Sequence, residues 1–344
     1  MKKKIAAIVV AVIAIIFLIV VFIAGSGKER VYTKENSPID YESELQARKE
    51  QNRILTGVQQ IMIGSRCNNY DEALATLKEI KEAGYDGIEL NEFMIKPTPL
   101  LVKIMTKVAG MPAGNGGKLD WQKLIAESGL KVISVHSYLN SIEENPAAVA
   151  EQALSFGTDT VVITGMYRFD YGNLTEVEKL AKRLNKAGES LSEYGVKLLY
   201  HNHNVELQRV TEDKTAYDII VENTDPRYVN FELDTYWMAD GGADVNDIIN
   251  KLGDRMVMWH INDRGCRKSG PFTTPILKED AAELGTGNMP LDSMMDKVRL
   301  NKRVKAIVLE THKNWIDKDP VKSLKVSAKW FERNGLMLQS KTKS

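Results

Sequence analysis

The feature that most constrains this fold is a repeated alternation of short apolar runs with longer amphipathic stretches, which starts near residue 57. The apolar runs have the length of strands, and the stretches between them have the length and periodicity of helices. The predicted strands cover residues 58–63, 87–90, 132–136, 160–164, 197–201, 229–233, 256–261 and 306–310. The predicted helices cover residues 70–83, 119–128, 146–156, 175–194, 215–222, 245–252, 291–298 and 320–334. This alternation predicts a parallel sheet whose strands are joined by helices.

Helix start and stop signals lie at the ends of these segments. The predicted N-caps are Asp71, Asp244 and Asp319. The glycines that follow predicted helix ends are Gly84, Gly129, Gly157, Gly195 and Gly335. A helix that ends in glycine and returns to a strand is typical of the turns in a parallel α/β sheet.

The number of elements favours one fold in the α/β class. Eight strands and eight helices in about 285 residues match the (β/α)8 TIM barrel. A doubly wound open sheet is the alternative, but no Gly-x-Gly-x-x-Gly follows the first predicted strand. We therefore predict a barrel over residues 53–338, with a short tail at residues 339–344.

The N-terminus has a different composition from the rest of the chain. Lys2, Lys3 and Lys4 precede a run of 21 residues, 5–25, that carries no charge. As a helix this run would span roughly 31 Å, the thickness of the hydrocarbon core of a bilayer. We predict a transmembrane signal anchor over residues 1–25 and a polar stalk over residues 26–52, with cleavage near Ser26 as the alternative. The basic N-terminus would stay in the cytoplasm, which places the barrel outside it.

The overall composition indicates a globular domain and excludes some partners. Hydrophobic residues make up 43% of the 344-residue chain and charged residues 27%. Residues 1–30 hold five basic residues and one acidic residue, which leaves 41 basic and 45 acidic residues, a net charge of −4, for the remainder. A mildly acidic body argues against a nucleic-acid partner. Cys67 and Cys266 have no metal-ligand spacing, and whether they pair stays open, as does an oligomeric state.

Histidines gather at one end of the predicted barrel. All five of them end or directly follow predicted strands: His136, His201, His203, His260 and His312. Three acidic residues lie in or at the ends of other predicted strands: Glu89, Asp234 and Glu310. The carboxyl ends of TIM-barrel strands form the active-site face. The long segments 91–118 and 264–288 leave the same face and are predicted to cover a substrate.

Four of these residues form a predicted metal site. A carboxylate buried among apolar strand residues must be paired, protonated or bound to metal. His201, Asp234, His260 and Glu310 would converge from four strands and suit one divalent ion, such as Mn²⁺, Co²⁺, Zn²⁺ or Mg²⁺. The alternative for any one of them is a polar group that only fills the barrel mouth.

At these residues the chain resembles a known family. The motifs that carry the resemblance are Gly84-Tyr-Asp-Gly-Ile-Glu89-Leu, Val135-His136-Ser, Tyr200-His-Asn-His203, Leu233-Asp234-Thr-Tyr-Trp237, His260-Ile-Asn-Asp263, Glu283-Leu-Gly-Thr-Gly287 and Val308-Leu-Glu310. In this order, over residues 55–338, they resemble the sugar phosphate isomerase/epimerase superfamily of xylose isomerase-like barrels, related to endonuclease IV. The resemblance implies one divalent metal bound by Glu, Asp, His and Glu, and a proton moved next to a sugar carbonyl.

The resemblance also implies roles for individual residues. The last three metal ligands of the family fall on Asp234, His260 and Glu310, whereas His201 stands where ketose epimerases have glutamate. Glu310, His203 and His201 are the predicted catalytic residues. The predicted substrate-binding residues are His136, Glu206, Glu89 and Trp237. The His-Asn-His motif is similar to the branch that contains inosose dehydratase-like proteins and enzymes of 3-keto-glycosides, and the absence of a phosphate-binding loop in the sequence argues against a phosphorylated substrate.

We therefore predict a metal-dependent isomerase, epimerase or related lyase that acts on a sugar or keto-sugar outside the cytoplasm. Cleavage of 3-keto-glycosides on the same site is one alternative. A membrane-tethered carbohydrate-binding protein without catalysis is another. A nuclease with the three-metal cluster of endonuclease IV is disfavoured, because Trp237 replaces one required histidine and no histidine lies between His260 and His312.

Overall fold

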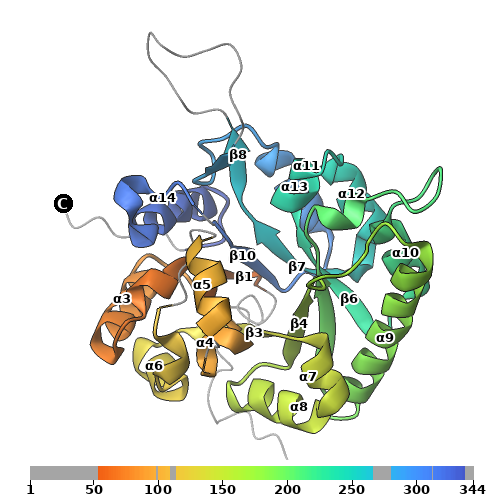
Figure 1. Ribbon diagram of the computed structural model, residues 1–344. Helices are drawn as coiled ribbons and strands as arrows, with labels where there is room; N and C mark the ends of the chain where they lie inside the picture. The colour runs from red at the N-terminus through yellow and green to blue at the C-terminus, as the bar shows by residue number, and fades with distance from the viewer. Residues whose placement is uncertain (1–52, 98–99, 109–113, 266–279, 312, 338–344) are drawn as a thin grey trace, which may run out of the picture. The chain divides into compact units, whose positions relative to one another are not determined.

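The computed structural model describes residues 53–337, apart from 98–99, 109–113, 266–279 and 312. Eight parallel strands close into a barrel in the order β1-β10-β7-β6-β5-β4-β3-β2 (Figure 1). These strands are β1 (Leu55–Gln59), β2 (Gly87–Asn91), β3 (Lys131–Ser137), β4 (Thr160–Thr164), β5 (Lys197–His201), β6 (Val229–Asp234), β7 (Met256–Ile261) and β10 (Ala306–Leu309). The predicted (β/α)8 barrel is confirmed.

Helices surround the barrel, as Figure 1 shows. The α-helices are α3 (Tyr70–Glu82), α4 (Glu92–Ile95), α5 (Leu100–Val108), α6 (Trp121–Ser128), α7 (Leu139–Glu144), α8 (Pro146–Ser155), α9 (Leu174–Ser192), α10 (Ala216–Asn223), α11 (Thr235–Asp240), α12 (Val245–Leu252), α13 (Leu291–Leu300) and α14 (Pro320–Arg333). Short 3₁₀ helices are η1 (Gln60–Arg66), η2 (Gly116–Lys118), η3 (Val205–Leu207), η4 (Gly253–Arg255) and η5 (Ile316–Lys318). Asp244 and Asp319 cap α12 and α14 as predicted.

Three local predictions are corrected by the structure. The first strand ends at Gln59, because the side chain of Gln59 accepts a hydrogen bond from the amide of Ile61 and starts η1. Helix α3 is capped by Asn69, two residues before the predicted Asp71. The segment 91–118 is not an open loop but carries α4, α5 and η2, while β8 (Asp263–Gly265) and β9 (Asp280–Ala282) form an antiparallel ribbon.

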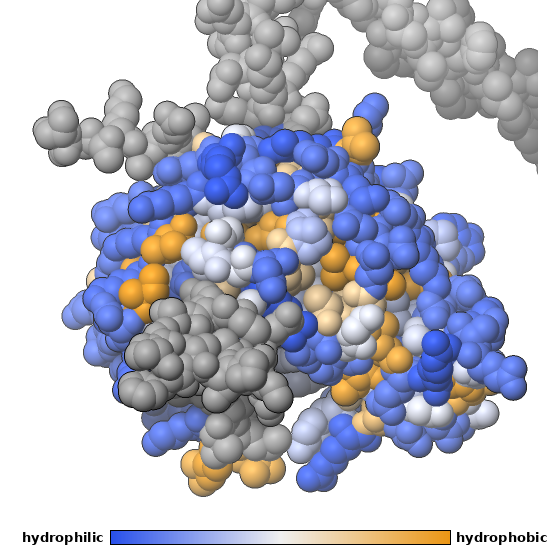
Figure 2. Space-filling view, turned by 90° about the horizontal axis from the view of Figure 1, so that it is seen from above, coloured by the Kyte–Doolittle hydropathy of each residue, from blue (hydrophilic) through white to orange (hydrophobic). Residues whose placement is uncertain are grey.

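The interior of the barrel is divided into an apolar layer and a polar layer. The apolar layer consists of Ile133, Val162, Leu199, Val257, Met258, Ala306 and Val308. Leu199, Met258 and Val308 each precede a polar residue at the strand end by two positions, so the two residues point to the same side. A second apolar core lies outside this layer and includes residues of the surrounding helices. The described face in Figure 2 is largely hydrophilic, with hydrophobic side chains in separate areas.

The prediction of a transmembrane helix is not supported. In the part of the chain that the structure describes, no helix is both long enough and apolar enough to cross a bilayer. The predicted anchor at residues 1–25 and the stalk at residues 26–52 lie outside the described residues, as does the tail at 339–344. The described residues therefore support the barrel, and the location outside the cytoplasm stays a prediction.

Candidate active site

Four side chains from four neighbouring strands meet at the carboxyl end of the barrel. His201 ends β5, Asp234 ends β6, His260 lies in β7, and Glu310 directly follows β10. One ligand atom from each of the four lies within 4.8 Å of the others. The strand register explains this convergence, because Asp234 pairs with His260 and His201 pairs with Glu232 across adjacent strands. The predicted metal-binding residues are thus brought together.

Backbone and side-chain hydrogen bonds hold this group in place. The side chain of Asn202 accepts a hydrogen bond from the amide of Asp234 at 3.0 Å and donates one to the carbonyl of Asp234 at 3.0 Å. This pair joins the ends of β5 and β6. Asp234 also caps α11, since its Oδ1 accepts a hydrogen bond from the amide of Trp237 at 2.8 Å. The direction of the Asp234 carboxylate is therefore set by the helix that follows it.

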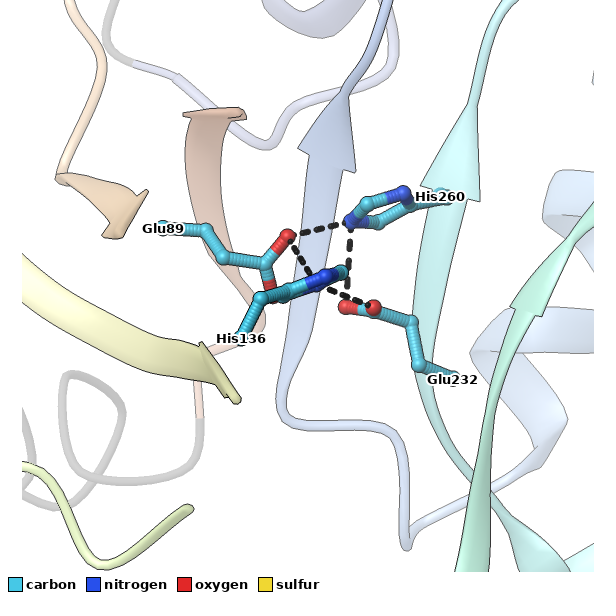
Figure 3. Close-up of side chains that lie close together, drawn as sticks. All are labelled: Glu89, His136, Glu232 and His260. Carbon is cyan, nitrogen blue, oxygen red and sulfur yellow. Dashed lines mark hydrogen bonds and ion pairs between the residues drawn. The ribbon is translucent and has the colours of Figure 1, made fainter. Parts of the chain in front are cut away.

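A second group of side chains, drawn in Figure 3, shares one histidine with the first. Its members are Glu89, His136, Glu232 and His260, and their ligand atoms also lie within 4.8 Å of one another. Nε2 of His260 lies 2.5 Å from Oε2 of Glu89 and 3.1 Å from Oε1 of Glu232. Nε2 of His136 lies 2.9 Å from Oε2 of Glu89 and 3.1 Å from Oε2 of Glu232. We call this group the inner cluster and the first group the outer cluster.

His260 presents opposite ring nitrogens to the two clusters. Nδ1 faces the outer cluster, at 3.0 Å from Oε2 of Glu310 and 3.9 Å from Oδ2 of Asp234. Nε2 faces the two glutamates of the inner cluster. The inner cluster has further support, because Thr164 Oγ1 lies 2.7 Å from Nδ1 of His136 and the hydroxyl of Ser134 donates to Glu89.

Both inner glutamates lie next to irregularities of strand register. The pairing of β2 with β3 shifts between Ile88 and Glu89, and the pairing of β6 with β7 shifts between Phe231 and Glu232. Each shift leaves one extra residue on the partner strand, Ile133 in β3 and Val257 in β7. Such bulges re-aim side chains and occur often beside active sites.

Burial and neighbouring charges determine the protonation of these groups. Burial opposes the charged form of His136, but Glu89 and Glu232 outweigh it and raise the pKa of His136 to about 10. The pKa of His260 is likewise raised against the effect of burial, by Glu232, Glu89 and Glu310. The pKa of Glu232 is lowered, because the three histidines outweigh burial. Burial lowers the pKa of His201, which favours the neutral imidazole that binds metals.

A pocket of about 810 Å³ opens beside the outer cluster. His201 and Glu310 line it, whereas Asp234 and His260 are 1% and 0% exposed and do not. His136, His203 and Trp237 line the pocket as well, and the rings of His203 and Trp237 lie 5.6 Å apart. The volume and largely apolar wall are typical of a small-molecule site.

Two residues predicted to bind substrate lie outside this pocket. Glu89 and Glu206 are both fully buried and are not among the residues that line it. Glu206 accepts hydrogen bonds from the hydroxyl of Tyr200 at 2.8 Å and from the amide of His203 at 3.0 Å. It therefore supports the segment that carries His203, and substrate contact by either glutamate stays a prediction. His312 lies outside the described residues.

Glu232 is the residue that the sequence analysis missed. It precedes Asp234 by two positions in β6, so a strand places both on the same side. This alternation of side chains along the strand is the signal that could have identified Glu232 from the sequence. Glu232 is fully buried and contacts three histidines. Its carboxylate contacts His136 and His260 as described above, and its Oε2 lies 3.4 Å from Nδ1 of His201.

The donor set of the outer cluster fits a divalent ion. It offers two imidazole and two carboxylate ligands, a combination that suits Zn²⁺, Mn²⁺ and Co²⁺. Two buried atoms next to it, Nδ1 of His201 and Oε1 of Glu232, have no hydrogen bond within the described residues. Carboxylates this deeply buried need a positive partner, and a divalent ion between the carboxylates and imidazoles would provide one.

Comparisons with known proteins agree with this fold. The family model of the xylose isomerase-like TIM barrel matches residues 77–334. An inosose dehydratase from Lactiplantibacillus plantarum is 25% identical over 275 residues, which cover 75% of this chain and 87% of the relative. Two solved structures share the fold. A sugar phosphate isomerase/epimerase from Parabacteroides distasonis has a TM-score of 0.62 and 18% identity, with 82% of this chain and 95% of that one covered. The IolI protein with a bound zinc atom has a TM-score of 0.57 and 16% identity, with 82% and 98% covered.

Proposed function

The chain belongs to the xylose isomerase-like TIM barrel family, and we propose that it is a metal-dependent enzyme that moves a proton next to the carbonyl of a keto-sugar or a cyclic polyhydroxylated ketone. The observation that carries the proposal is the outer cluster, four potential ligands within 4.8 Å at the edge of a pocket of about 810 Å³. The likeness to an inosose dehydratase and to a zinc-binding structure supports the substrate class and the ion.

We assign the ion to His201, Asp234, His260 and Glu310. When bound, a divalent ion there supplies a Lewis acid that stabilises negative charge developing on substrate oxygens. The pocket has room for a monosaccharide or cyclitol with a substituent, since sites of this size bind molecules larger than a single sugar ring.

Two pocket residues are placed to transfer protons. Glu310 lines the pocket at the end of β10, and its carboxylate accepts the proton from the carbon next to the carbonyl. His203 lines the same pocket from the segment after β5 and donates a proton to a substrate oxygen. The hydrogen bond from its amide to Glu206, at 3.0 Å, holds that segment in place.

The fate of the substrate depends on where the proton returns. Return of a proton to the same carbon or its neighbour gives epimerisation or isomerisation. Loss of the neighbouring hydroxyl group, which leaves as water after protonation by His203, gives a dehydrated ketone. We favour dehydration as the first reaction to test, because an inosose dehydratase is 25% identical over 75% of this chain.

Solvent exchange tests the proton transfer before the product is known. The chain, loaded with Mn²⁺, Co²⁺ or Zn²⁺, is mixed with ketoses, inososes and 3-keto-glycosides in heavy water. We expect deuterium next to the carbonyl, or a dehydrated or cleaved product, with at least one of them. Glu310→Gln should lower the rate by about 100-fold or more, the usual contribution of a general base.

The control variant is Glu144→Gln, which changes an exposed carboxylate on the wall of the same pocket but outside both clusters. Its rate should stay near that of the wild-type chain. If sugars bind to the ion-loaded protein but none of them exchanges or reacts, the protein is a carbohydrate-binding protein and the proposed activity is wrong.

A further inference from the structure

Glu232 is the point at which both clusters meet. Its carboxylate is fully buried in β6 and contacts three imidazole rings from three other strands. Two of these rings, His201 and His260, belong to the outer cluster, and the third, His136, belongs only to the inner cluster. Glu232 itself lies outside the outer cluster and does not line the pocket.

The contacts of Glu232 define which nitrogen of each ring faces inward. Nδ1 of His201 lies 3.4 Å from Oε2 of Glu232, and Nε2 of His260 lies 3.1 Å from Oε1. A carboxylate only accepts hydrogen bonds, so a nitrogen that faces it carries the proton. The opposite nitrogens, Nε2 of His201 and Nδ1 of His260, are then left for an ion. Nδ1 of His260 also lies 3.0 Å from Oε2 of Glu310, and an ion between these two atoms would take the place of a proton there.

We propose that Glu232 is a positioning residue that sets the direction in which His201 and His260 bind the ion of the outer cluster. Its carboxylate lies 3.4 Å from Nδ1 of His201 and 3.1 Å from Nε2 of His260, close enough to accept their protons once an ion fixes the rings. It also adds one negative charge behind a set of ligands that contains only two carboxylates. This role rests on the proposed function, because it concerns the ion assigned there. Carboxylates that hold metal-bound histidines in this way fix ring orientation and raise affinity.

The neighbouring glutamate does not provide the same contact to both rings. Glu89 lies 2.5 Å from Nε2 of His260 and could hold that proton alone. Nδ1 of His201, in contrast, has no hydrogen bond to any described residue, and the carboxylate it faces is that of Glu232, whose Oε2 lies 3.4 Å away. The effect of Glu232 should therefore be strongest on His201.

A glutamine at position 232 has the same shape but the wrong hydrogen-bonding groups. Its amide offers one accepting oxygen and an NH₂ group that only donates. Three imidazole nitrogens surround this position, so at least one of them would face a donor and would have to turn its lone pair inward. For His201 the outward nitrogen would then carry the proton and could not bind an ion, whereas Glu89 could still hold the proton of His260.

Ion affinity measures this effect without any assay of activity. Zn²⁺ and Co²⁺ affinities are determined by competition with a chelator for the wild-type chain, Glu232→Gln and Glu283→Gln. We expect Glu232→Gln to lower affinity by about 10- to 100-fold, the usual effect of removing such a partner. Glu283 is the matched control, because it is 2% exposed, accepts a hydrogen bond from Ser323 at 2.8 Å and belongs to neither cluster.

A measurement on the wild-type chain keeps the proposal testable if Glu232→Gln does not fold. Nitrogen NMR of ¹⁵N-labelled histidine in the Zn²⁺-loaded protein should show a proton on Nδ1 of His201 and on Nε2 of His260, with the opposite nitrogens metal-bound. The reverse assignment for His201 would overturn the proposal.

Two further outcomes would also overturn it. One is a Glu232→Gln chain that binds the ion as tightly as the wild type. The other is two ions per wild-type chain with one lost in the variant, which would make Glu232 a ligand of the inner cluster. If the wild-type chain binds no divalent ion at all, the ion of the proposed function is contradicted, and this role with it.

Discussion

At the scale of single residues, Asp234 combines two tasks that can be separated by mutation. Its carboxylate belongs to the outer cluster, and its Oδ1 caps α11 through the amide of Trp237. Asparagine caps helices about as well as aspartate, whereas alanine does not cap. Asparagine lacks the negative charge, however, so it is the weaker ligand for a divalent ion.

Asp234→Asn should therefore weaken ion binding while it leaves the stability of the chelator-treated protein nearly unchanged. Asp234→Ala should weaken ion binding and also lower the free energy of unfolding by about 1 kcal/mol, the usual value of a helix cap. Elemental analysis measures the ion content, and urea denaturation measures stability.

The matched control is Asp244→Asn, because Asp244 caps α12 but belongs to neither cluster. It should keep the full ion content. If Asp234→Asn retained as much ion as this control, the ion would bind elsewhere in the chain.

At the scale of elements, the site depends on how closely helices approach the barrel. Helix α9 reaches from Leu174 to Ser192, and Gly188 faces the segment that leads into β6. A Cβ atom at position 188 would lie 2.4 Å from the carbonyl oxygen of Tyr228, which is shorter than any normal contact. The glycine therefore lets α9 lie against the strand that carries Glu232 and Asp234.

Gly188→Ala tests this close approach. Alanine would favour the helix by up to about 1 kcal/mol in an exposed position. Here the added methyl group would clash with backbone atoms, and their displacement requires a shift of the chain. Overpacking of this kind lowers the free energy of unfolding by about 1–3 kcal/mol. We expect a net loss of stability in urea denaturation. Lys182→Ala, at an exposed position of the same helix, should be nearly neutral, and a stabilised Gly188→Ala chain would contradict the close packing.

At the scale of the whole molecule, the outer cluster connects four of the eight barrel strands. His201, Asp234, His260 and Glu310 come from β5, β6, β7 and the end of β10, and β10 pairs with β1 to close the barrel. In an unfolded chain these ligands are spread over more than one hundred residues. An ion that binds all four should therefore stabilise the folded barrel and not the unfolded chain.

Divalent ion at about 100 times its dissociation constant should add about 2.7 kcal/mol to the free energy of unfolding. For a domain of this size that corresponds to a rise in melting temperature of about 5–10 °C, which a chelator should reverse. Differential scanning calorimetry with Zn²⁺, and then with excess chelator, measures the change. An equal rise in Asp234→Asn would show that the stabilising ion binds at another site.

The arrangement of the barrel and the convergence of the outer cluster could be predicted from sequence alone. Each apolar run and each amphipathic stretch carries its own local periodicity, so β5 and α9 can be recognised without any partner. Once eight such units are assumed to close into a barrel, the ends of the strands meet at one face. His201, Asp234, His260 and Glu310 were assigned to one site for this reason, together with their ligand chemistry and the family resemblance, and their roles as ligands stay predictions.

The inner cluster was decided only by the tertiary structure. Glu89 and His260 are separated by 171 positions, and their contact depends on the register of strands that are far apart in the chain. The bulges beside Glu89 and Glu232 set that register, and they arise from packing between neighbouring strands and not from a local pattern. Alternation along β6 placed Glu232 on the same side as Asp234, but only the folded barrel shows that three imidazoles surround its carboxylate.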